Sequence, residues 1–428
     1  MKRYDAYKPS GIEWIGEVPK EWDKVHIKRT CVCKNGLFID GDWIESKDLA
    51  GDSGTIRYLT SGNVGVIKYK EQGDGYITEE KFNELRCTEV LPGDILISRL
   101  NEPIGRACIV PDLNSKIVCA VDNVICRPDD SLYDRRYLVY QMNCRAYSDY
   151  TNCLARGTGM HRISRAMLGQ ISILVPLLPE QTAIADYLDA KCAKIDNVVA
   201  VQQKRIELLK ELKQSIITHA VTKGLDKNAK MKDSGIEWIG KVPDSWEKCR
   251  FKNFVTLINK PTVGGNKIGL ENIESGSGKF LPSDSEFDGD GVGFVVGDIV
   301  YGKLRPYLMK VWVAEFSGNA VGDFFVFRVK DNTDSAFVKY LMLSDGFTKE
   351  ANGATEGAKM PRVSSDFILT LRYYLPPKKE QTAITEYLDK KCAKIDRQIA
   401  KVEKQIELLN EYKQSVITEC VTGKRKVC

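Results

Sequence analysis

Two stretches of this sequence, 180–222 and 380–422, carry the same pattern of apolar and polar positions. Aligned with a shift of 200 residues, they share 28 identities in 43 positions. Neither stretch contains Gly or Pro, and apolar residues recur at alternating steps of three and four, which is a heptad pattern. The seam positions are Leu188, Cys192, Ile195, Val199, Ile206, Leu209, Ile216 and Ala220, then Leu388, Cys392, Ile395, Ile399, Val402, Ile406, Leu409, Val416 and Cys420. Each stretch is therefore predicted to form one helix about 60 Å long.

A single helix with such a seam would expose it to water, and the two copies offer each other a partner. The pattern favours an intramolecular coiled coil over the alternative, two separate intermolecular seams. Lys213 and Lys413 interrupt both seams, and Gln202 interrupts the first. Polar seam positions commonly fix the register of a coiled coil.

A shorter repeat opens each half of the chain. Residues 10–16 return unchanged as 234–240, and Trp22 returns as Trp246. The repeat is turn-rich and apolar, which is typical of a packing element with a buried Trp. We interpret it as a structural element and not as a site.

Between the opening repeat and the long helix, each half carries about 150 residues with strand-like runs and Gly-rich turns. The strands predicted in the first half are 55–60, 94–100, 116–121, 124–126 and 171–176, with a helix over 134–152. Those of the second half are 298–304, 311–314 and 324–329, with a helix over 335–350. The order of elements is the same in both halves although most residues differ. The chain therefore repeats one unit, which consists of an opening motif, a variable α/β module and a long helix.

Length and composition add modest limits. A chain of 428 residues is long enough for two or three domains, and its net charge of +5 permits nucleic-acid binding without arguing for it. No apolar run is long enough to cross a bilayer, and the amino end lacks a signal-peptide core. The 13 cysteines are odd in number and show no paired spacing, which favours a reducing cytoplasm.

A search for catalytic motifs finds none. The sequence lacks a phosphate-binding loop, an amino-methyltransferase tetrad and the acidic signature of a magnesium nuclease. His26, His161 and His219 are the three histidines, and no Cys-x-x-Cys accompanies them, so a zinc site is not expected. We expect no cofactor, no metal and no catalytic activity of the chain itself.

Several phrases resemble the DNA-specificity subunit of type I restriction-modification systems, and the resemblance covers essentially the whole chain. The phrases are PLLPEQTAI at 176–184, GDILISR at 93–99, IGLENI at 268–273, GDIVYGKLRPYL at 297–308, KMPRV at 359–363 and PPKKEQ at 376–381. Any one of them alone is weak, and the doubled long helix makes the set specific.

The resemblance implies an α/β (α+β) protein with two target recognition domains joined by two long antiparallel helices, with a pseudo-twofold internal repeat. Each domain would read one half of a bipartite, asymmetric double-stranded DNA site. Two methyltransferase (M) subunits would dock on the helices, restriction (R) subunits would join that complex, and the partners would methylate adenine. The implied divisions are 1–178 and 224–375 for the first and second recognition domains, 179–223 for the first spacer helix, and 376–428 for the second spacer helix and basic tail.

Geometry agrees with this implication. Two recognition modules that bind the same face of DNA must lie about one helical turn apart, ~34–36 Å, or a multiple of that distance. A rigid pair of helices about 60 Å long can set such a distance. We therefore expect the helices to set the unread gap and the modules to read the bases.

DNA binding needs cations for phosphates and forked or amide side chains for base edges. The candidates are Arg99, Asn101, Arg106, Arg156, His161, Arg162 and Arg165 in the first half, and Lys303, Arg305, Tyr307, Lys310, Lys359 and Arg362 in the second. For each cation an ordinary solvated charge is the alternative. Arg162 and Arg362 share the 200-residue offset, and Gly157-Thr158-Gly159 suggests a contact loop beside the first.

The polar stretch 34–44 is a further segment that would suit a DNA-facing loop. We favour a plain structural loop around a buried Trp43. For the chain as a whole, two other functions stay open: a coiled-coil scaffold whose modules bind proteins, and an enzyme without a recognised motif. Salt-sensitive binding to one bipartite duplex would separate DNA reading from the scaffold.

Overall fold

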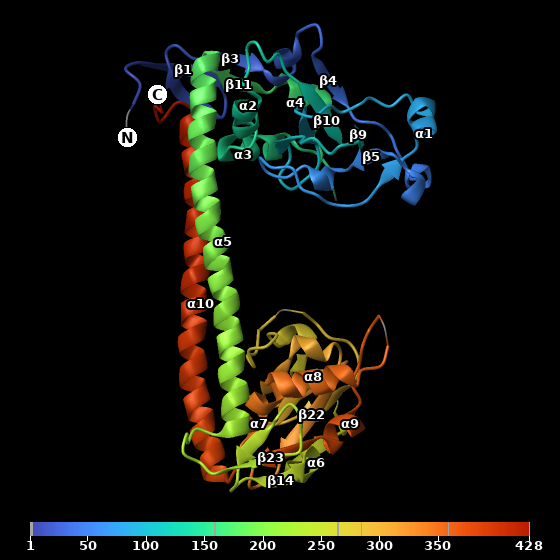
Figure 1. The fold of residues 1–428 in the computed structure, drawn as a ribbon, viewed down its shortest axis with the longest axis vertical. Coiled ribbons are helices and arrows are strands. Elements are labelled where there is room, and N and C mark those ends of the chain that lie inside the picture. The colour runs from blue at the N-terminus through green and yellow to red at the C-terminus, as the bar shows by residue number, and fades with distance from the viewer. Residues whose placement is uncertain (1–2, 158–159, 263–264, 284, 358, 428) are drawn as a thin grey trace. The chain divides into compact units, whose positions relative to one another are not determined.

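The computed structural model describes residues 3–157, 160–262, 265–283, 285–357 and 359–427. Two long helices, α5 (Leu178–Lys223) and α10 (Lys378–Val421), run as the sequence predicts (Figure 1). The chain divides into two compact units. The first comprises 1–201 and 405–428, and the second comprises 202–404. Each unit therefore contains one α/β module and one part of each long helix.

The two helices pack against each other antiparallel. In the first unit Lys413 of α10 donates a hydrogen bond of 2.5 Å to Asp196 of α5. In the second unit Lys213 of α5 donates one of 2.7 Å to Asp396 of α10. The lysines that interrupt the heptad seams thus pair across the helices with repeated aspartates. This confirms the predicted fold class of two α/β modules with an intramolecular pair of long helices.

These ion pairs predict how the helical pair responds to mutation and pH. Burial opposes it, but hydrogen bonds from Lys413 and Lys68 hold the pKa of Asp196 below its usual value. Lys413→Ala is expected to destabilise the first unit by about 1 kcal/mol at neutral pH. Because the folded pKa is depressed, this stabilisation exists above the pKa of an unfolded Asp and disappears as the pH falls through the folded pKa.

Urea unfolding at pH 7 and at pH 3 would measure this difference. Because Lys68 also binds Asp196, the reciprocal swap of Lys413→Asp with Asp196→Lys is made together with Lys68→Ala, and it should recover stability relative to Lys413→Ala with Lys68→Ala. Lys204 forms an exposed ion pair with Glu207, and Lys204→Ala serves as the control. An equal loss for Lys204→Ala would contradict a register role for Lys413.

The first module, residues 23–175, is built on two small sheets. One is antiparallel with the order β4-β10-β7-β8, and the other has the order β6-β5-β9 with β5 and β9 parallel. The strands are β4 (Leu37–Asp40), β5 (Ile56–Leu59), β6 (Tyr76–Ile77), β7 (Ile95–Ser98), β8 (Ala107–Ile109), β9 (Lys116–Cys119) and β10 (Asn123–Arg127). A further pair joins β3 (Asp23–His26) to β11 (Ser172–Val175). The short helices are α1 (Glu79–Glu84), α2 (Arg135–Gln141), α3 (Arg145–Leu154) and α4 (Arg165–Gln170).

The second module, residues 247–375, repeats this arrangement. Its main sheet has the order β15-β22-β19-β20, and a second sheet has the order β16-β18-β21-β17 with β17 and β21 parallel. The strands are β15 (Val255–Ile258), β16 (Pro261–Thr262), β17 (Lys267–Ile268), β18 (Gly291–Phe294), β19 (Ile299–Gly302), β20 (Val311–Val313), β21 (Gly318–Val321) and β22 (Phe324–Val329). Strand β14 (Glu247–Arg250) pairs with β23 (Arg372–Leu375). The helices are α6 (Phe251–Phe254), α7 (Ser335–Met342), α8 (Asp345–Gly353) and α9 (Ser365–Thr370).

The single helix predicted in each module is two helices, so that expectation is wrong in both halves. The break falls between α2 and α3, and again between α7 and α8. Asn143 lies in the first break, where its side-chain amide donates to the carbonyls of Ala107 and Val139. Ser344 caps α8 by accepting from the amide of Phe347. Side chains that bond to the backbone compete with helix continuation, and the apolar periodicity does not reveal this.

The opening repeat forms a short β-hairpin in each unit. The strands are β1 (Tyr7–Ile12) with β2 (Ile15–Pro19), and β12 (Met231–Asp233) with β13 (Lys241–Pro243). Trp22 and Trp246 follow the hairpins and are both buried. They belong to the cores that include the ends of the long helices.

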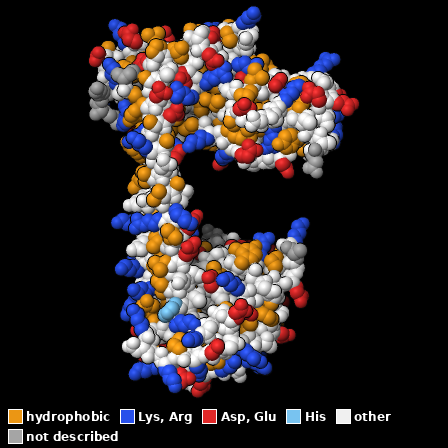
Figure 2. Space-filling model, viewed as in Figure 1, with side chains coloured by type: hydrophobic (Ala, Val, Ile, Leu, Met, Phe, Trp, Pro, Cys, Tyr) orange, Lys and Arg blue, Asp and Glu red, His pale blue; other side chains and the backbone are white. Residues whose placement is uncertain are grey.

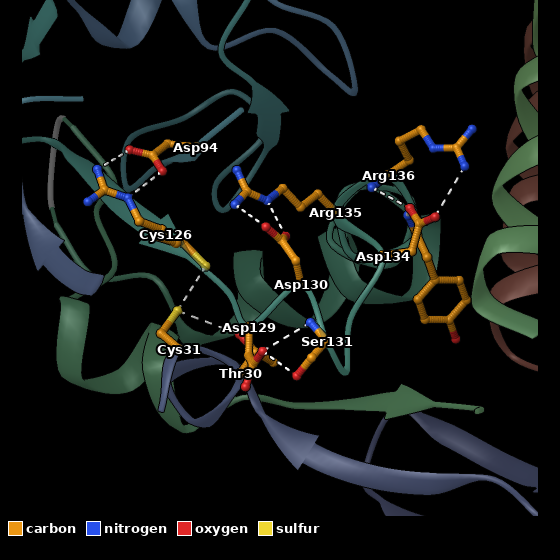
Figure 3. A network of polar contacts seen from close by, with 12 residues as sticks. Thr30, Cys31, Asp94, Cys126, Asp129, Asp130, Ser131, Asp134, Arg135 and Arg136 are labelled. Atoms are coloured by element: carbon orange, nitrogen blue, oxygen red, sulfur yellow. Dashed lines mark hydrogen bonds and ion pairs between the residues drawn. The ribbon is translucent and has the colours of Figure 1, made fainter. Parts of the chain in front are cut away.

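The repeated Glu-Gln phrase has a structural role. Gln181 is buried at the start of α5, where it accepts from the amide of Asp134 and donates to the carbonyls of Leu132 and Pro176. Gln381 makes the equivalent bonds at the start of α10. One glutamine thus ties the helix to the chain just before α2 or α7. Figure 3 shows Asp134 and Arg136 at this junction in the first unit.

Both ends of the chain complete the first unit. The hydroxyl of Tyr7 donates to the carbonyl of Gly423, and Arg425 donates to the hydroxyl of Tyr187. In the second unit the corresponding connection is covalent, because α5 runs on into the second hairpin. The described cysteines are free thiols, including Cys31 and Cys126, whose sulfur atoms lie 3.5 Å apart (Figure 3).

Candidate nucleic-acid interface

In each module the same backbone hydrogen bond, referred to below as the backbone frame, joins the residue after a central strand (β7 or β19) to a later loop. In the first, the segment after β7 binds the 156–163 loop: the amide of Ile163 donates to the carbonyl of Arg99, at 3.1 Å. In the second, the amide of Val363 donates to the carbonyl of Lys303, at 3.2 Å. Arg162 pairs with Leu100 in one module as Arg362 pairs with Leu304 in the other. Residues equivalent by sequence offset are therefore equivalent in structure.

The first cluster, formed by Arg99, Arg162, Arg165, Asp40 and Asp122, lies on this frame. Arg162 contacts Asp122 at 2.9 Å, and Arg165 contacts Asp40 at 3.6 Å. Arg99 is buried between the two carboxylates, 3.3 Å from Asp40 and 4.0 Å from Asp122, and its guanidinium donates to the carbonyl of Val121. Burial lowers the pKa of Arg99. Arg162 and Arg165 are the exposed members, with 42% and 44% of their side chains accessible.

The second cluster is smaller and consists of Lys303, Arg362 and Asp323. The Arg362 guanidinium binds the Asp323 carboxylate through two hydrogen bonds of 2.9 Å each. These bonds raise the pKa of Arg362. Lys303 lies 3.9 Å from the same carboxylate, and 46% of the Arg362 side chain is accessible. Arg162 in the first cluster and Arg362 in the second are thus exposed arginines that are each held by an aspartate, and Arg165 is a second exposed arginine of the first cluster.

Arg106 and Lys310 occupy equivalent positions inside the modules. Arg106 is buried and donates to the carbonyls of Ser61, Val64, Leu100 and Pro103. Lys310 donates to the carbonyls of Leu270 and Ile273. Burial lowers the pKa of both groups. These contacts give both cations a structural role, which the sequence pattern did not distinguish from a surface role.

The other candidates are exposed. They are Asn101, Arg156 and His161 in the first module, and Arg305, Tyr307 and Lys359 in the second. Arg305 adopts a left-handed backbone conformation, with φ of 51°, and its amide donates to the carbonyl of Pro361. Of the predicted glycine loop, Thr158 and Gly159 lie outside the described residues.

Sequence reasoning missed the aspartates that hold the cations. Asp122 and Asp323 each precede a strand, β10 or β22. Their backbone carbonyls accept from the backbone amides of Arg99 and Lys303, which follow β7 and β19. The sequence contains a signal for them, since each aspartate lies directly before its strand, but the search for DNA contacts considered cations and amides and not acids. The Gly-Asp-Ile phrases mark another pair: Asp94 binds Arg127 and Asp298 binds Arg328 through two hydrogen bonds each.

The expectation of a buried Trp43 is wrong. Its residue is 68% exposed, and its indole N–H donates to Glu45 at 3.2 Å. The flanking chain is packed, since Tyr58 donates to the carbonyl of Ile44. The alternation of apolar and polar residues in 34–44 did not show which apolar side chain points outward.

Charges of both signs are interspersed on the visible face of each unit (Figure 2). This agrees with the small net charge. Among the described residues, no group of three or more His, Cys, Asp or Glu is arranged to hold a metal ion. No helix in the described part of the chain is long and apolar enough to cross a membrane.

Known proteins share both the sequence pattern and the fold. The model of the family described as "Type I restriction modification DNA specificity domain" matches residues 19–211. The MjaVIII specificity subunit of Methanocaldococcus jannaschii is 25% identical, with 92% of this chain and 95% of that protein covered. The chain is therefore similar to type I specificity subunits over nearly its whole length.

Two further relatives and one solved structure show the same similarity. The putative MjaX specificity subunit of the same organism is 25% identical, with 96% of each chain covered. The EcoDI specificity subunit of Escherichia coli is 26% identical over 63% of this chain and 66% of that one. The fold matches a chain of the structure described as "Structural basis underlying complex assembly and conformational transition of the type I R-M system". That match has a TM-score of 0.70 at 13% identity and covers 95% of this chain and 99% of the other.

Proposed function

We propose that this chain is the non-catalytic DNA sequence-recognition subunit of a type I restriction-modification complex. Each module reads one half of a bipartite, asymmetric DNA target. The long helices set the gap between the halves and dock two methyltransferase subunits, and restriction subunits join the complex. Its place of action is the cytoplasm, where that DNA is found.

One observation carries this proposal. The clusters around Arg162 and Arg362 stand on the same backbone frame in two modules whose surrounding residues differ. Repetition of the frame indicates the same kind of ligand, and divergence of the neighbours indicates two different sequences. We propose the corresponding division of the chain into recognition domains at 1–178 and 224–375 and spacer segments at 179–223 and 376–428.

The exposed candidates form the proposed contact set. Arg162, Arg165 and Arg362 suit phosphates or guanine edges, because a guanidinium presents a planar fork of donors. Asn101, Arg156, His161, Lys303, Arg305, Tyr307 and Lys359 complete the set. Arg99 is proposed to position Asp40 and Asp122, and Arg106 and Lys310 to support the loops.

Mapping methylated adenines tests the function directly. A methylation-free host expressing this chain with its methyltransferase should carry one bipartite, asymmetric methylated sequence. Replacing residues 247–375 by the module of a relative should change one half of that sequence and leave the other. Methylation that is unaffected by the replacement would contradict the proposal, and a purified complex that binds no duplex in a salt-dependent way would favour a protein-binding scaffold.

The arginine–aspartate pairs predict opposite effects of neighbouring mutations. Arg362→Ala is expected to weaken binding of the target duplex about tenfold and to reduce its salt slope by about one. Asp323→Asn removes the negative charge beside Arg362 and is expected to strengthen non-specific binding. Fluorescence anisotropy over a salt series measures both, with the exposed strand residue Arg372, changed to Ala, as control. Weakening by both substitutions would contradict a phosphate contact.

A further inference from the structure

Trp43 is the exposed tryptophan of this chain. All six tryptophans lie in the described residues; Trp22, Trp246 and Trp312 are buried at 1%, and Trp14 and Trp238 are half-buried. An exposed indole loses the favourable free energy that burial of such a large apolar side chain normally provides. It therefore calls for an explanation in terms of a partner.

The backbone around Trp43 is tied down on both sides. The carboxylate of Asp42 accepts from the amide of Thr88 at 2.9 Å, and the carbonyl of Ile44 accepts from Tyr58. After the indole, Glu45 and Asp48 form a capping box. The loop thus displays the Trp43 side chain from a fixed frame, which lowers the entropy cost of binding through it.

The same loop adjoins the first cluster. Asp40 of that cluster lies three residues before Trp43. The amides of Gly41 and Asp42 donate to the carbonyls of Asn123 and Cys119, at 2.8 Å each. Those acceptors flank Val121 and Asp122, the residues that bind Arg99 and Arg162. A Cβ on Gly41 would lie 2.4 Å from the carbonyl oxygens of Cys119 and Ala120, so the close approach requires glycine.

The charged groups near the indole are carboxylates and the lysines that pair with them. Asp42, Glu45 and Asp48 lie on its own loop, and Glu45 accepts from the indole itself. Lys47 pairs with Glu45 at 2.7 Å and Lys81 lies 3.6 Å from Asp48, so neither of these lysines is left unpaired for a phosphate group. A base or a thymine methyl group, which are flat or apolar, suits an indole face.

We propose that Trp43 contacts a base of the half-site read by the first module, through the face of its indole. The contact rests on the proposed DNA-reading function and adds a specificity residue to it. Ile39 and Ile258 occupy the same place beside β10 and β22, and counting four residues on from each leads to Trp43 in the first module and to Thr262, paired with Gly291, in the second. The contact thus belongs to one half-site and distinguishes the two.

Tryptophan fluorescence of the complex with its methyltransferase tests this contact. The probe is a duplex carrying the bipartite sequence found by methylation mapping, and binding is followed separately by anisotropy. The difference between the wild type and Trp43→Phe isolates the Trp43 emission from that of all other tryptophans. We expect the duplex to quench this emission, and Trp43→Ala to weaken binding about tenfold with an unchanged salt slope. Trp43→Phe keeps an aromatic face and should bind nearly as well as the wild type.

Several outcomes would overturn the contact. Normal duplex binding with unquenched Trp43 emission and unaltered Trp43→Ala affinity removes it while leaving the DNA-reading function intact. A change of the emission on adding methyltransferase without DNA assigns Trp43 to a protein interface instead. Failure of the wild-type complex to bind the bipartite duplex overturns the proposed function itself and the contact with it.

Discussion

Deleting one heptad from each long helix is expected to shorten the gap between the two half-sites by about three base pairs. Seven helical residues span ~10.5 Å, and base pairs of DNA are stacked ~3.4 Å apart. The deletions that keep the helices paired are 202–208 in α5 and 401–407 in α10. Both lie between the Asp196–Lys413 and Lys213–Asp396 ion pairs, so each pair keeps its partner and its register.

Methylation mapping of cells that express the double deletion measures the new gap. Both half-sites should keep their bases, because neither module is altered. Deleting 202–208 alone is the control, since it removes a heptad from one helix only and should abolish modification by breaking the register. An unchanged gap in a double-deletion protein that still methylates would contradict a spacer role of the helices.

Arg106→Ala is expected to destabilise the first unit by about 3 kcal/mol. The buried guanidinium donates to four backbone carbonyls, and hydrogen bonds to a charged group contribute about 1.5–3 kcal/mol, whereas unpaired buried acceptors are costly. Lys310→Ala removes two such bonds from the second unit and should cost less, about 2 kcal/mol.

Hydrogen exchange of core peptides measures the two units separately. Peptides of β7 and β10 should lose protection in Arg106→Ala while those of β19 and β22 keep it, and Lys310→Ala should reverse this pattern. The exposed Arg156, changed to Ala, is the control and is expected to change stability by less than about 0.5 kcal/mol. Equal effects of Arg106→Ala and Arg156→Ala would show that the carbonyl contacts contribute little.

The clusters show why sequence reasoning found the loops without separating the roles of their cations. Arg99, Arg106 and Arg162 look alike in sequence, yet the first is clamped by two aspartates, the second is buried and the third is half-exposed. Which role each takes depends on carbonyls and carboxylates that are distant in sequence, such as Val64 for Arg106 and Asp122 for Arg162. Local pattern carries no information about such partners.

The sequence by itself determined the duplicated organisation of this protein and its two long helices. A heptad pattern is a local property, because the apolar spacing and the absence of Gly and Pro act along one segment. The α/β character of the modules and fewer than half of their described strands followed from equally local signals. Tertiary structure alone decided where the α2–α3 break falls, which cations are buried, and that Trp43 faces outward. Those features depend on contacts between segments that are far apart in the chain. The free energies of these contacts outweigh the local conformational preference of any one residue.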